Sequence, residues 1–379
     1  MKDSIGRRIK EERTRQNFTQ DELIEKAKLD WERQTLGQVE NGEREIKAWE
    51  LAKISSVLRM DMSAFFPRET ATQQQPYVLW RKKPKNPARI EAEFLRLCKD
   101  YELVETLNSV NANEFQTLPH RKIDLGTFSY PDAYLLAEQV RNELTLGDFP
   151  ASSLVKILEE KFGIKFFFND LEGNGSAASS VSSFGYCTLV SSSEVPWRQH
   201  FSIAHELFHL ITWDDALLAQ VNSEKGLWDC NERLADSFAA GLLVPTETLG
   251  REIRALSKNN KLNGAGIVAI ARQFGVSLEA LLWRMVGLRF LAKNTAEKAL
   301  ADDQLRTLDR NIRAEMATEP VQTESNRFLR LAYIAYENGE ISRGRLAKML
   351  DIPISDLSDH LKRHGLAEVS NNEIPLSNP

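Results

Sequence analysis

Histidine and cysteine are scarce in this 379-residue sequence, with 6 and 3 residues respectively. The cysteines (Cys98, Cys187 and Cys230) lie far apart along the chain and form no Cys-x-x-Cys pair. Their spacing excludes a cysteine-based zinc motif and indicates no disulfide framework. We therefore expect a reducing compartment and a cytoplasmic protein.

Long apolar runs are also absent, because no stretch reaches 18 apolar residues, which predicts that no segment spans a membrane. The N-terminal residues are charged and lack the apolar core of a signal peptide. Finally, the net charge of -5 and a pI near 5.9 exclude a global basic field. Any DNA contact must therefore come from a local surface.

Apolar residues recur at three- and four-residue spacings through most of the chain, which is typical of amphipathic helices. Only 164–168 and 186–190 have strand character, so we predict a mainly α protein with a small β-sheet (α+β). The length favours two or three domains. We expect an all-α domain at 1–67, a linker and helical connector at 68–129, a mixed domain at 130–250 and a helical C-terminal region at 251–370.

Composition also suggests the character of the connecting segments. Residues 69–76 are expected to form a linker, the Gly/Ser-rich stretch 172–183 a mobile loop, and 371–379 a frayed end. The basic run 80–85, which contains one tryptophan, is interpreted as solvated linker although it could touch nucleic acid. Apolar stripes on helices within 88–110 and 131–162 are expected to be buried, with these members: Ile90, Phe94, Leu97, Leu103, Leu135, Val140, Leu144, Leu154 and Leu158.

Two segments near the C-terminus share one pattern. Residues 268–282 and 345–361 each predict a short helix, a turn that ends at a Ser or Pro signal, and a second short helix. Such pairs are common in helical proteins, so we interpret them as packing units without DNA contact.

The segment FSIAHELFHLITW at 201–213 contains two of the six histidines in a His-Glu-x-x-His pattern, formed by His205, Glu206 and His209. Residues four apart share a helix face, so both imidazoles can reach one ion at about 2.0–2.1 Å. Glu206 lies beside them, where it can accept a hydrogen bond from a water. We expect a helix over Trp197–Trp213, with Ser202 as a candidate start signal. The alternative is a helix with two hydrogen-bonded core histidines.

A catalytic zinc needs three protein ligands and one open position. The segment NERLADSFAAGLLVP at 231–245 places Glu232 and Asp236 four apart, on one helix face. Glu232 is the expected third ligand, and Asp236 is expected to accept a hydrogen bond from the far nitrogen of a ligating histidine. Asp229 remains a rival ligand, and a solvated acidic face is the alternative for Glu232 and Asp236.

The strings FSIAHELFHL and ERLADSFAAGLLVP resemble the ImmA/IrrE family of intracellular bacterial peptidases, within the Glu-zincin group. In that family, glycine is frequent where Phe208 stands and asparagine where Asp236 stands. The resemblance implies a zincin-like fold at 130–250 and one Zn²⁺ ion, with another divalent metal as the alternative. It implies His205, His209 and Glu232 as ligands and Glu206 as the catalytic base.

The same resemblance implies how a peptide would be cleaved. Zinc lowers the pKa of a bound water toward about 7 and polarises the scissile carbonyl, and Glu206 transfers the proton to the leaving amine. An extended substrate is expected to add to an exposed strand, for which Tyr186–Val190 is the candidate. A lid is the alternative for 172–183, and His200 is interpreted as a surface residue, not as an oxyanion helper.

The strings TQDEL at 19–23 and QVENG at 38–42 resemble the phage-repressor-like helix-turn-helix domains, often called XRE or Cro-type. Thr19 and Glu22 predict a capping box, and Gly42 predicts a helix end. The resemblance implies a recognition helix at Asp30–Asn41, after a turn about two residues longer than the family's. It implies that double-stranded DNA is contacted by these residues: Gln20 at a phosphate, and Arg33, Gln34, Thr35 and Gln38 in the major groove.

Charge limits this interpretation, because residues 1–70 hold 14 Lys/Arg and 14 Asp/Glu, which predicts no strong nonspecific affinity for DNA. A protein-interaction module of the same fold is the alternative. A homodimer is compatible with paired half-sites. No heptad seam supports it in the sequence.

Together the two resemblances imply a DNA-binding regulatory zinc metallopeptidase that cleaves a repressor, often of the helix-turn-helix type, to switch on a stress or mobile-element response. The alternative is a transcriptional regulator, antitoxin-like or for phage defence, whose zinc domain is a sensor or structural module. The open coordination position and Glu206 favour the enzyme, because a structural zinc usually has four protein ligands.

Overall fold

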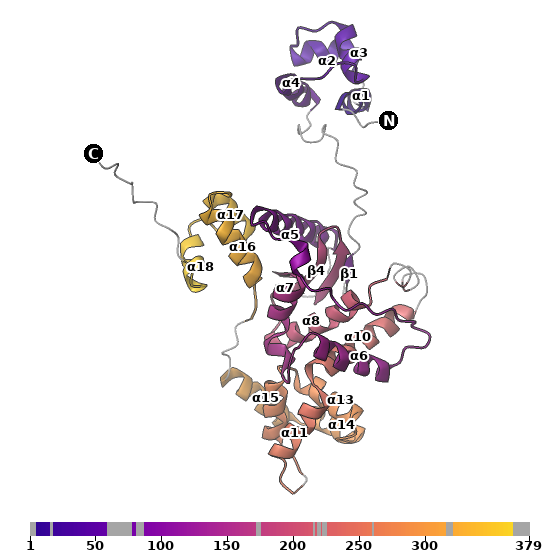
Figure 1. Ribbon diagram of the computed structural model, residues 1–379, viewed down its shortest axis with the longest axis vertical. Helices are drawn as coiled ribbons and strands as arrows, with labels where there is room; N and C mark the ends of the chain where they lie inside the picture. Colours follow the sequence, from indigo (N-terminus) through magenta and orange to yellow (C-terminus); the bar gives the residue numbers. More distant parts are fainter. Residues whose placement is uncertain are drawn as a thin grey trace, which may run out of the picture. The chain divides into compact units, whose positions relative to one another are not determined.

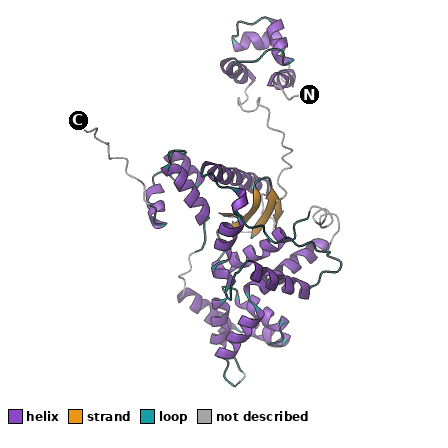
Figure 2. Ribbon diagram, in the orientation of Figure 1, coloured by secondary structure: helices purple, strands orange, loops and turns teal. Residues whose placement is uncertain are grey.

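The computed structural model describes residues 5–15, 18–58, 78–80, 87–171, 176–214, 217, 221, 226–259, 261–315 and 321–366. Within these ranges it contains 17 α-helices and one four-stranded sheet, which confirms the predicted α+β class (Figure 1, Figure 2). The chain divides into two compact units, residues 1–75 and 76–379. The expected linker at 69–76 and the expected frayed end at 371–379 lie outside the described residues.

The N-terminal unit contains the helices α1 (Ile5–Arg15), α2 (Gln20–Ala27), α3 (Arg33–Glu40) and α4 (Ala48–Leu58). The Thr19 hydroxyl accepts a hydrogen bond from the Glu22 amide, and the Glu22 carboxylate accepts one from the Thr19 amide. This reciprocal pair confirms the predicted capping box at the start of α2. Apolar side chains of all four helices form one buried cluster, which includes Ile9, Leu23, Leu36, Leu51 and Ile54.

The second unit is built around a sheet with the strand order β1-β3-β4-β2. The strands are β1 (Val78–Trp80), β2 (Lys165–Asn169), β3 (Ala177–Ser182) and β4 (Gly185–Ser191). Strand β3 pairs antiparallel with β1 and β4, whereas β2 pairs parallel with β4. Because alternate side chains point to opposite faces, Ala178 and Leu189 join one buried cluster, and Phe166 and Val190 join another.

Three expectations for this region are wrong. Residues 177–182, expected in a mobile loop, form β3, and Tyr186–Val190, the expected edge strand, lie in the central strand β4. The edges of the described sheet are β1 and β2. Trp80, expected in a solvated linker, is buried in β1, and its indole donates to a carboxylate oxygen of Glu91 at 2.7 Å. The remainder of the basic run, 81–85, lies outside the described residues.

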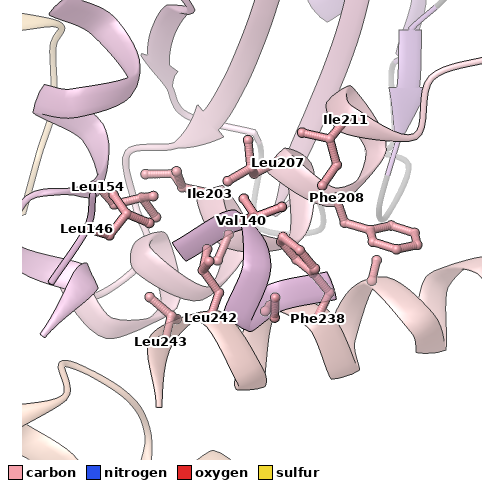
Figure 3. Close-up of a cluster of buried hydrophobic side chains, with 14 of the residues drawn as sticks. Val140, Leu146, Leu154, Ile203, Leu207, Phe208, Ile211, Phe238, Leu242 and Leu243 are labelled. Carbon is pink, nitrogen blue, oxygen red and sulfur yellow. The ribbon is translucent and has the colours of Figure 1, made fainter. Parts of the chain in front are cut away.

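Helices cover both faces of the sheet. One buried cluster joins the sheet to α5 (Pro87–Leu107), α16 (Asn326–Glu337), α17 (Arg343–Met349) and α18 (Leu357–Arg363). The other joins it to α6 (Tyr130–Glu143), α7 (Leu154–Phe162), α8 (Pro196–Ile211) and α10 (Leu227–Leu243). Figure 3 shows this second cluster, in which Leu207 and Phe208 of α8 lie near Val140 of α6 and Phe238 of α10.

The remaining helices are α11 (Thr246–Leu256), α12 (Gly264–Gln273), α13 (Leu278–Gly287), α14 (Lys293–Ala301) and α15 (Asp303–Glu315), with short 3-10 turns at Ala112–Glu114 and Pro150–Ser152. The pairs α12–α13 and α17–α18 confirm the two predicted helix-turn-helix patterns, and Ser277 caps α13 with its hydroxyl. No single helix in the described ranges has both the length and the hydropathy to cross a membrane, and α12 with α13 meets that test only across a 97° bend.

Two of the apolar residues expected in the core are exposed. Leu103 of α5 is 37% exposed and Leu135 of α6 is 55% exposed. The buried stripe of α5 runs through Cys98, Tyr101 and Val104 instead. Side chains of consecutive residues point about 100° apart around a helix axis. An error of one position in the predicted apolar stripe is therefore enough to place an exposed leucine in the core.

A buried carboxylate on α7 predicts a pH-dependent stability. Burial raises the pKa of Glu159 to about 7, although Ser325 donates a hydrogen bond to it at 2.5 Å. The protonated form is therefore favoured by folding, and the associated stability is lost as the pH rises from below 4.5 to above 7. We expect Glu159→Gln to raise the free energy of unfolding by up to about 3 kcal/mol at pH 8 and to have little effect at pH 4. Thermal unfolding at both pH values tests this, and equal effects at the two values would contradict it.

Candidate metal centre

Two helices position the residues of the candidate centre. Helix α8 begins at Pro196, where the fixed backbone angle of proline suits the first turn. This is one residue before the predicted start at Trp197. Ser202, the candidate start signal, lies in the middle of the helix instead, and its hydroxyl donates to Glu194. Helix α10 packs against α8, with the rings of Phe238 and Phe208 5.6 Å apart between centroids, and Ala235 and Ala239 of α10 are small and fully buried. Their size allows a close approach, which brings Glu232 to the histidines of α8.

His205, His209 and Glu232 converge at a single point. The Nε2 atoms of the two histidines lie 3.1 Å apart. Each also lies 3.3 Å from one oxygen of the Glu232 carboxylate. The three candidate ligand atoms all lie within 4.8 Å of one another, which is the separation expected around one ion. The structure therefore brings together the three residues that the sequence suggested as metal ligands.

The chemistry of this donor set fits a cation. The Nδ1 atom of His205 lies 2.9 Å from a carboxylate oxygen of Asp236, so in the neutral ring Nδ1 carries the proton and Nε2 carries a lone pair. That lone pair faces a second imidazole nitrogen and a carboxylate. Three electron-rich atoms at this spacing repel one another unless a cation or protons lie between them. The residues present thus fit a zinc ion, or another divalent transition metal.

The electrostatics of Glu232 support the same conclusion. Burial would raise the pKa of this carboxyl, but hydrogen bonds and charge from His205 and His209 outweigh it and lower the pKa to about 2. Glu232 is therefore ionised across the neutral range. An ionised carboxylate held against two imidazoles is a ligand set that zinc prefers.

Glu206 is fully buried, and it lies between the metal cluster and the sheet. The hydroxyl of Ser179, on β3, donates a hydrogen bond to its Oε2 atom at 2.5 Å. The other oxygen, Oε1, is buried and has no hydrogen-bond partner. Burial raises the pKa of Glu206, which neighbouring charge and the Ser179 bond only partly offset. One carboxylate oxygen is thus held in place, and the other is left to accept a proton or a water.

The sequence did not reveal Ser179. It lies in a stretch rich in Ser, Gly and Ala that has no strand pattern, and no motif spacing connects it to Glu206. Only the pairing of β3 with β1 and β4 brings it under α8.

Each ligating histidine has a second contact that orients the ring. For His205, this contact is the one between Nδ1 and the Asp236 carboxylate. The side-chain amide of Asn231 lies 3.4 Å from Nδ1 of His209, and its Oδ1 atom is buried without a partner. With Oδ1 turned to His209, the amide would accept the Nδ1 proton and leave Nε2 free to bind metal. Asn231 was also missed in the sequence.

Two other candidates are not part of the cluster. Asp229, the rival ligand, is exposed on the first turn of α10 and belongs to neither of the metal-ligand clusters found among the described residues. His200 is half-buried, with its Nδ1 atom 3.2 Å from the carbonyl oxygen of Gly275. Its contacts place it against the turn before α13, not beside Glu206.

A cleft of about 510 Å³ lies next to the centre. It is bounded by α6, α8, α10 and α13, and its wall includes Tyr134, Trp197, Phe201 and Trp283. Asp236 also lines it, whereas the three candidate ligands do not. Asp236 therefore connects the cleft to the cluster, because it lines the cleft and also contacts Nδ1 of His205.

The Asp236 contact predicts a change in metal affinity. We expect Asp236→Ala to weaken zinc binding about 10- to 100-fold, because His205 loses the acceptor that fixes its tautomer. Competition with a zinc-binding dye measures the affinity. Asp236→Asn is the matched control, since its carbonyl oxygen can still accept the proton, and it should lose less. Equal affinity of wild type and Asp236→Ala would show that the contact is incidental.

In the N-terminal unit, the helix predicted to recognise DNA is shorter than expected. Helix α3 spans Arg33–Glu40, so the expected start at Asp30 is wrong by three residues, while the end before Gly42 is confirmed by its left-handed backbone. In the turn before α3, the guanidinium of Arg44 lies over the ring of Trp31, 4.7 Å from its centroid.

The five residues expected at DNA lie on or beside α3. Arg33 and Gln34 are exposed at the start of the helix, whereas Thr35 and Gln38 are half-buried. Gln20 donates to Glu40 at 2.8 Å and accepts from Arg33 at 3.3 Å. These contacts connect the N-terminus of α2 to both ends of α3.

Comparison with known proteins finds a family model that matches part of the chain. Residues 159–285 match the family model of a peptidase family described as the IrrE N-terminal-like domain. No curated protein sequence matches the chain.

Similar solved structures include a transcriptional regulator from Mycobacterium tuberculosis, with 20% identity over 49% of this chain and 51% of that chain and a TM-score of 0.31. The chain thus spans about half the length of that regulator. A second is Bacillus thuringiensis PlcR in complex with the peptide PapR7 and DNA, with 10% identity over 96% of this chain and 97% of that chain and a TM-score of 0.18. A third is ComR from Streptococcus suis, with 12% identity over 96% of this chain and 91% of that chain and a TM-score of 0.16.

The matched range, 159–285, contains α8, α10 and strands β2 to β4, and with them His205, Glu206, His209 and Glu232. This part of the chain is therefore similar to a peptidase domain of the IrrE N-terminal-like type.

Proposed function

We propose that the chain is a DNA-binding regulatory zinc metallopeptidase that cleaves a regulatory protein, most simply a repressor of the helix-turn-helix type. The observation that carries this proposal is the cluster of His205, His209 and Glu232 beside the buried, unpartnered oxygen of Glu206. A purely structural zinc site usually has four protein ligands and needs no base. Here three ligands and a free carboxylate oxygen match the requirements of hydrolysis.

A zinc ion bound at this cluster would supply Lewis acidity and an acidified water. The chain's own residues do the rest. His205, held by Asp236, and His209, held by Asn231, keep their Nε2 atoms directed inward. Glu206 takes up the proton of the attacking water at Oε1 and delivers it to the leaving amine, while Ser179 fixes its Oε2 atom. The aromatic cleft beside Asp236 would take substrate side chains.

The experiment is co-expression with candidate helix-turn-helix repressors from the same genome, one at a time. Cleavage of the repressor that disappears with a zinc chelator and returns with added Zn²⁺ would support the proposal. An intact repressor, in the presence of a chain shown to hold zinc, would favour the alternative of a metal sensor or structural module.

DNA binding is the second part of the proposal. Arg33 and Gln34 are exposed on the first turn of α3, and their side chains suit base edges. We expect Arg33→Ala with Gln34→Ala to weaken binding to the protein's own promoter region by at least tenfold, since one good base contact is worth about 1–3 kcal/mol. A gel shift measures this.

The matched control is Lys53→Ala, which also removes a positive charge, but from the exposed side of α4. It should bind DNA within about twofold of wild type at 0.15 M salt. If no sequence binds above nonspecific background, the N-terminal unit is an interaction module instead.

A further inference from the structure

The C-terminal helix α18 holds a second pair of histidines, four residues apart. His360 lies in its last turn, and His364 immediately follows it. Both face Glu324, in the segment before α16. The Nε2 atom of His360 lies 3.0 Å from one carboxylate oxygen of Glu324, and that of His364 lies 2.7 Å from the other. The two imidazole rings are 5.0 Å apart between centroids.

This group repeats the arrangement of the first centre. In both, two histidines at i and i+4 direct Nε2 at the two oxygens of one glutamate. The ligand atoms of Glu324, His360 and His364 also lie within 4.8 Å of one another. The two pairs use four of the six histidines in the chain.

The local environment differs from that of the first centre. The side chains of His360, Glu324 and His364 are 12%, 21% and 30% exposed. An ion could therefore enter from solvent, and water could complete its coordination.

We propose that Glu324, His360 and His364 bind a divalent transition-metal ion, with Zn²⁺ as the best match, at a site separate from the candidate peptidase centre. Two neutral imidazoles and one carboxylate are a donor set that suits zinc, cobalt or nickel. Magnesium and calcium prefer oxygen ligands and would bind poorly here. The donor set alone thus selects the class of ion.

The position of the site ties it to helix α8. Glu324 lies two residues after Gln322, whose backbone amide and carbonyl both bond the side chain of Gln199 on α8, at 3.1 and 2.9 Å. The next residue, Ser325, bonds Glu159 on α7. An ion would therefore fasten α18 to a segment that is already held against the helix of the peptidase centre.

The test counts metal ions in the full chain, stripped with chelator and then equilibrated with Zn²⁺. The variant His205→Gln with His209→Gln removes the first cluster, and we expect it to bind one equivalent of zinc. Adding His360→Gln and His364→Gln should reduce this to none, and wild type should bind two. Co²⁺ in place of Zn²⁺ should give visible absorption in the double variant and none in the quadruple variant.

Two matched variants guard against loss of folding. His120→Gln, added to the double variant, changes an exposed histidine outside both clusters and should leave its one equivalent of bound zinc in place. Glu324→Gln, which lies outside α18 and keeps a hydrogen-bonding side chain, should weaken zinc affinity at least tenfold with an unchanged circular dichroism spectrum. The counts in the double and quadruple variants depend neither on peptidase activity nor on zinc at the first centre, so failure of the proposed function would leave them intact. No zinc bound in the double variant, or zinc retained in the quadruple variant, would overturn the second site.

Discussion

Replacement of Glu206 by glutamine is expected to lower the rate of repressor cleavage about 100- to 10,000-fold, because a general base is worth roughly that factor. The zinc content should not change, since Glu206 is not among the three converging ligands. Glutamine is nearly the same size, and its carbonyl oxygen can still accept the Ser179 hydrogen bond that holds Oε2. What it cannot do is take up a proton at neutral pH.

The cleavage rate is measured by gel densitometry on the purified repressor, with zinc determined on the same samples. Ser179→Ala is the matched variant. It keeps the Glu206 carboxylate but removes the hydrogen bond to Oε2, so we expect a smaller decrease in the cleavage rate, of about tenfold. Cleavage by Glu206→Gln at the wild-type rate would show that the proton is moved by another group. Loss of zinc in that variant would show that Glu206 is itself a ligand.

The second large effect is expected at Gly6, where α1 crosses α3. A Cβ atom at this position would come within 1.7 Å of the backbone carbonyl oxygen of Val39. Backbone cannot rotate away as a flexible side chain can, so the two helices would have to separate. We expect Gly6→Ala to destabilise the N-terminal unit by about 3 kcal/mol or more, at the upper end for an overpacked site. DNA binding should be lost with it.

Gly37, on α3, is the matched control for Gly6. A Cβ there meets only the Gln20 amide nitrogen, at 3.8 Å, which is an ordinary contact. Gly37→Ala should therefore be tolerated and should gain up to about 1 kcal/mol from the higher helix propensity of alanine. Hydrogen exchange of α1 and α3 in the full chain reports on this unit alone. Slow exchange retained in Gly6→Ala would contradict the close crossing of the helices.

The parts of the centre that could be predicted from sequence are those specified by helix periodicity. His205 and His209 share a face because they are one turn apart, and the same spacing joins Glu232 to Asp236. Local pattern was sufficient here because each helix contributes its residues from consecutive turns.

The parts that could not be predicted depend on pairing between distant segments. Strand β1 lies about a hundred residues before its partner β3, and five of the six residues of β3 are alanine or serine, which give little strand signal. Without β1 and β3, the sheet had only two strands, and β4 was wrongly placed at its edge. Ser179, which anchors Glu206, was missed for the same reason.

The second metal cluster illustrates a different limit. His360 and His364 have the same spacing as His205 and His209, but no motif around them signals a ligand. Their third partner, Glu324, lies 36 residues earlier and is brought to them by the packing of α18 beside the start of α16. A pair of histidines becomes a candidate site only when the fold supplies the carboxylate.

The central claim is that His205, His209 and Glu232 hold one divalent ion with an open position facing Glu206. Anomalous diffraction at the zinc edge, on crystals of the full chain grown with Zn²⁺, tests it most directly. We predict a peak bonded to Nε2 of His205, Nε2 of His209 and the Glu232 carboxylate, at about 2.0–2.2 Å. The remaining ligand should be a solvent molecule within hydrogen-bonding distance of Oε1 of Glu206. A fourth protein ligand at that position, or no peak at this cluster, would contradict the claim.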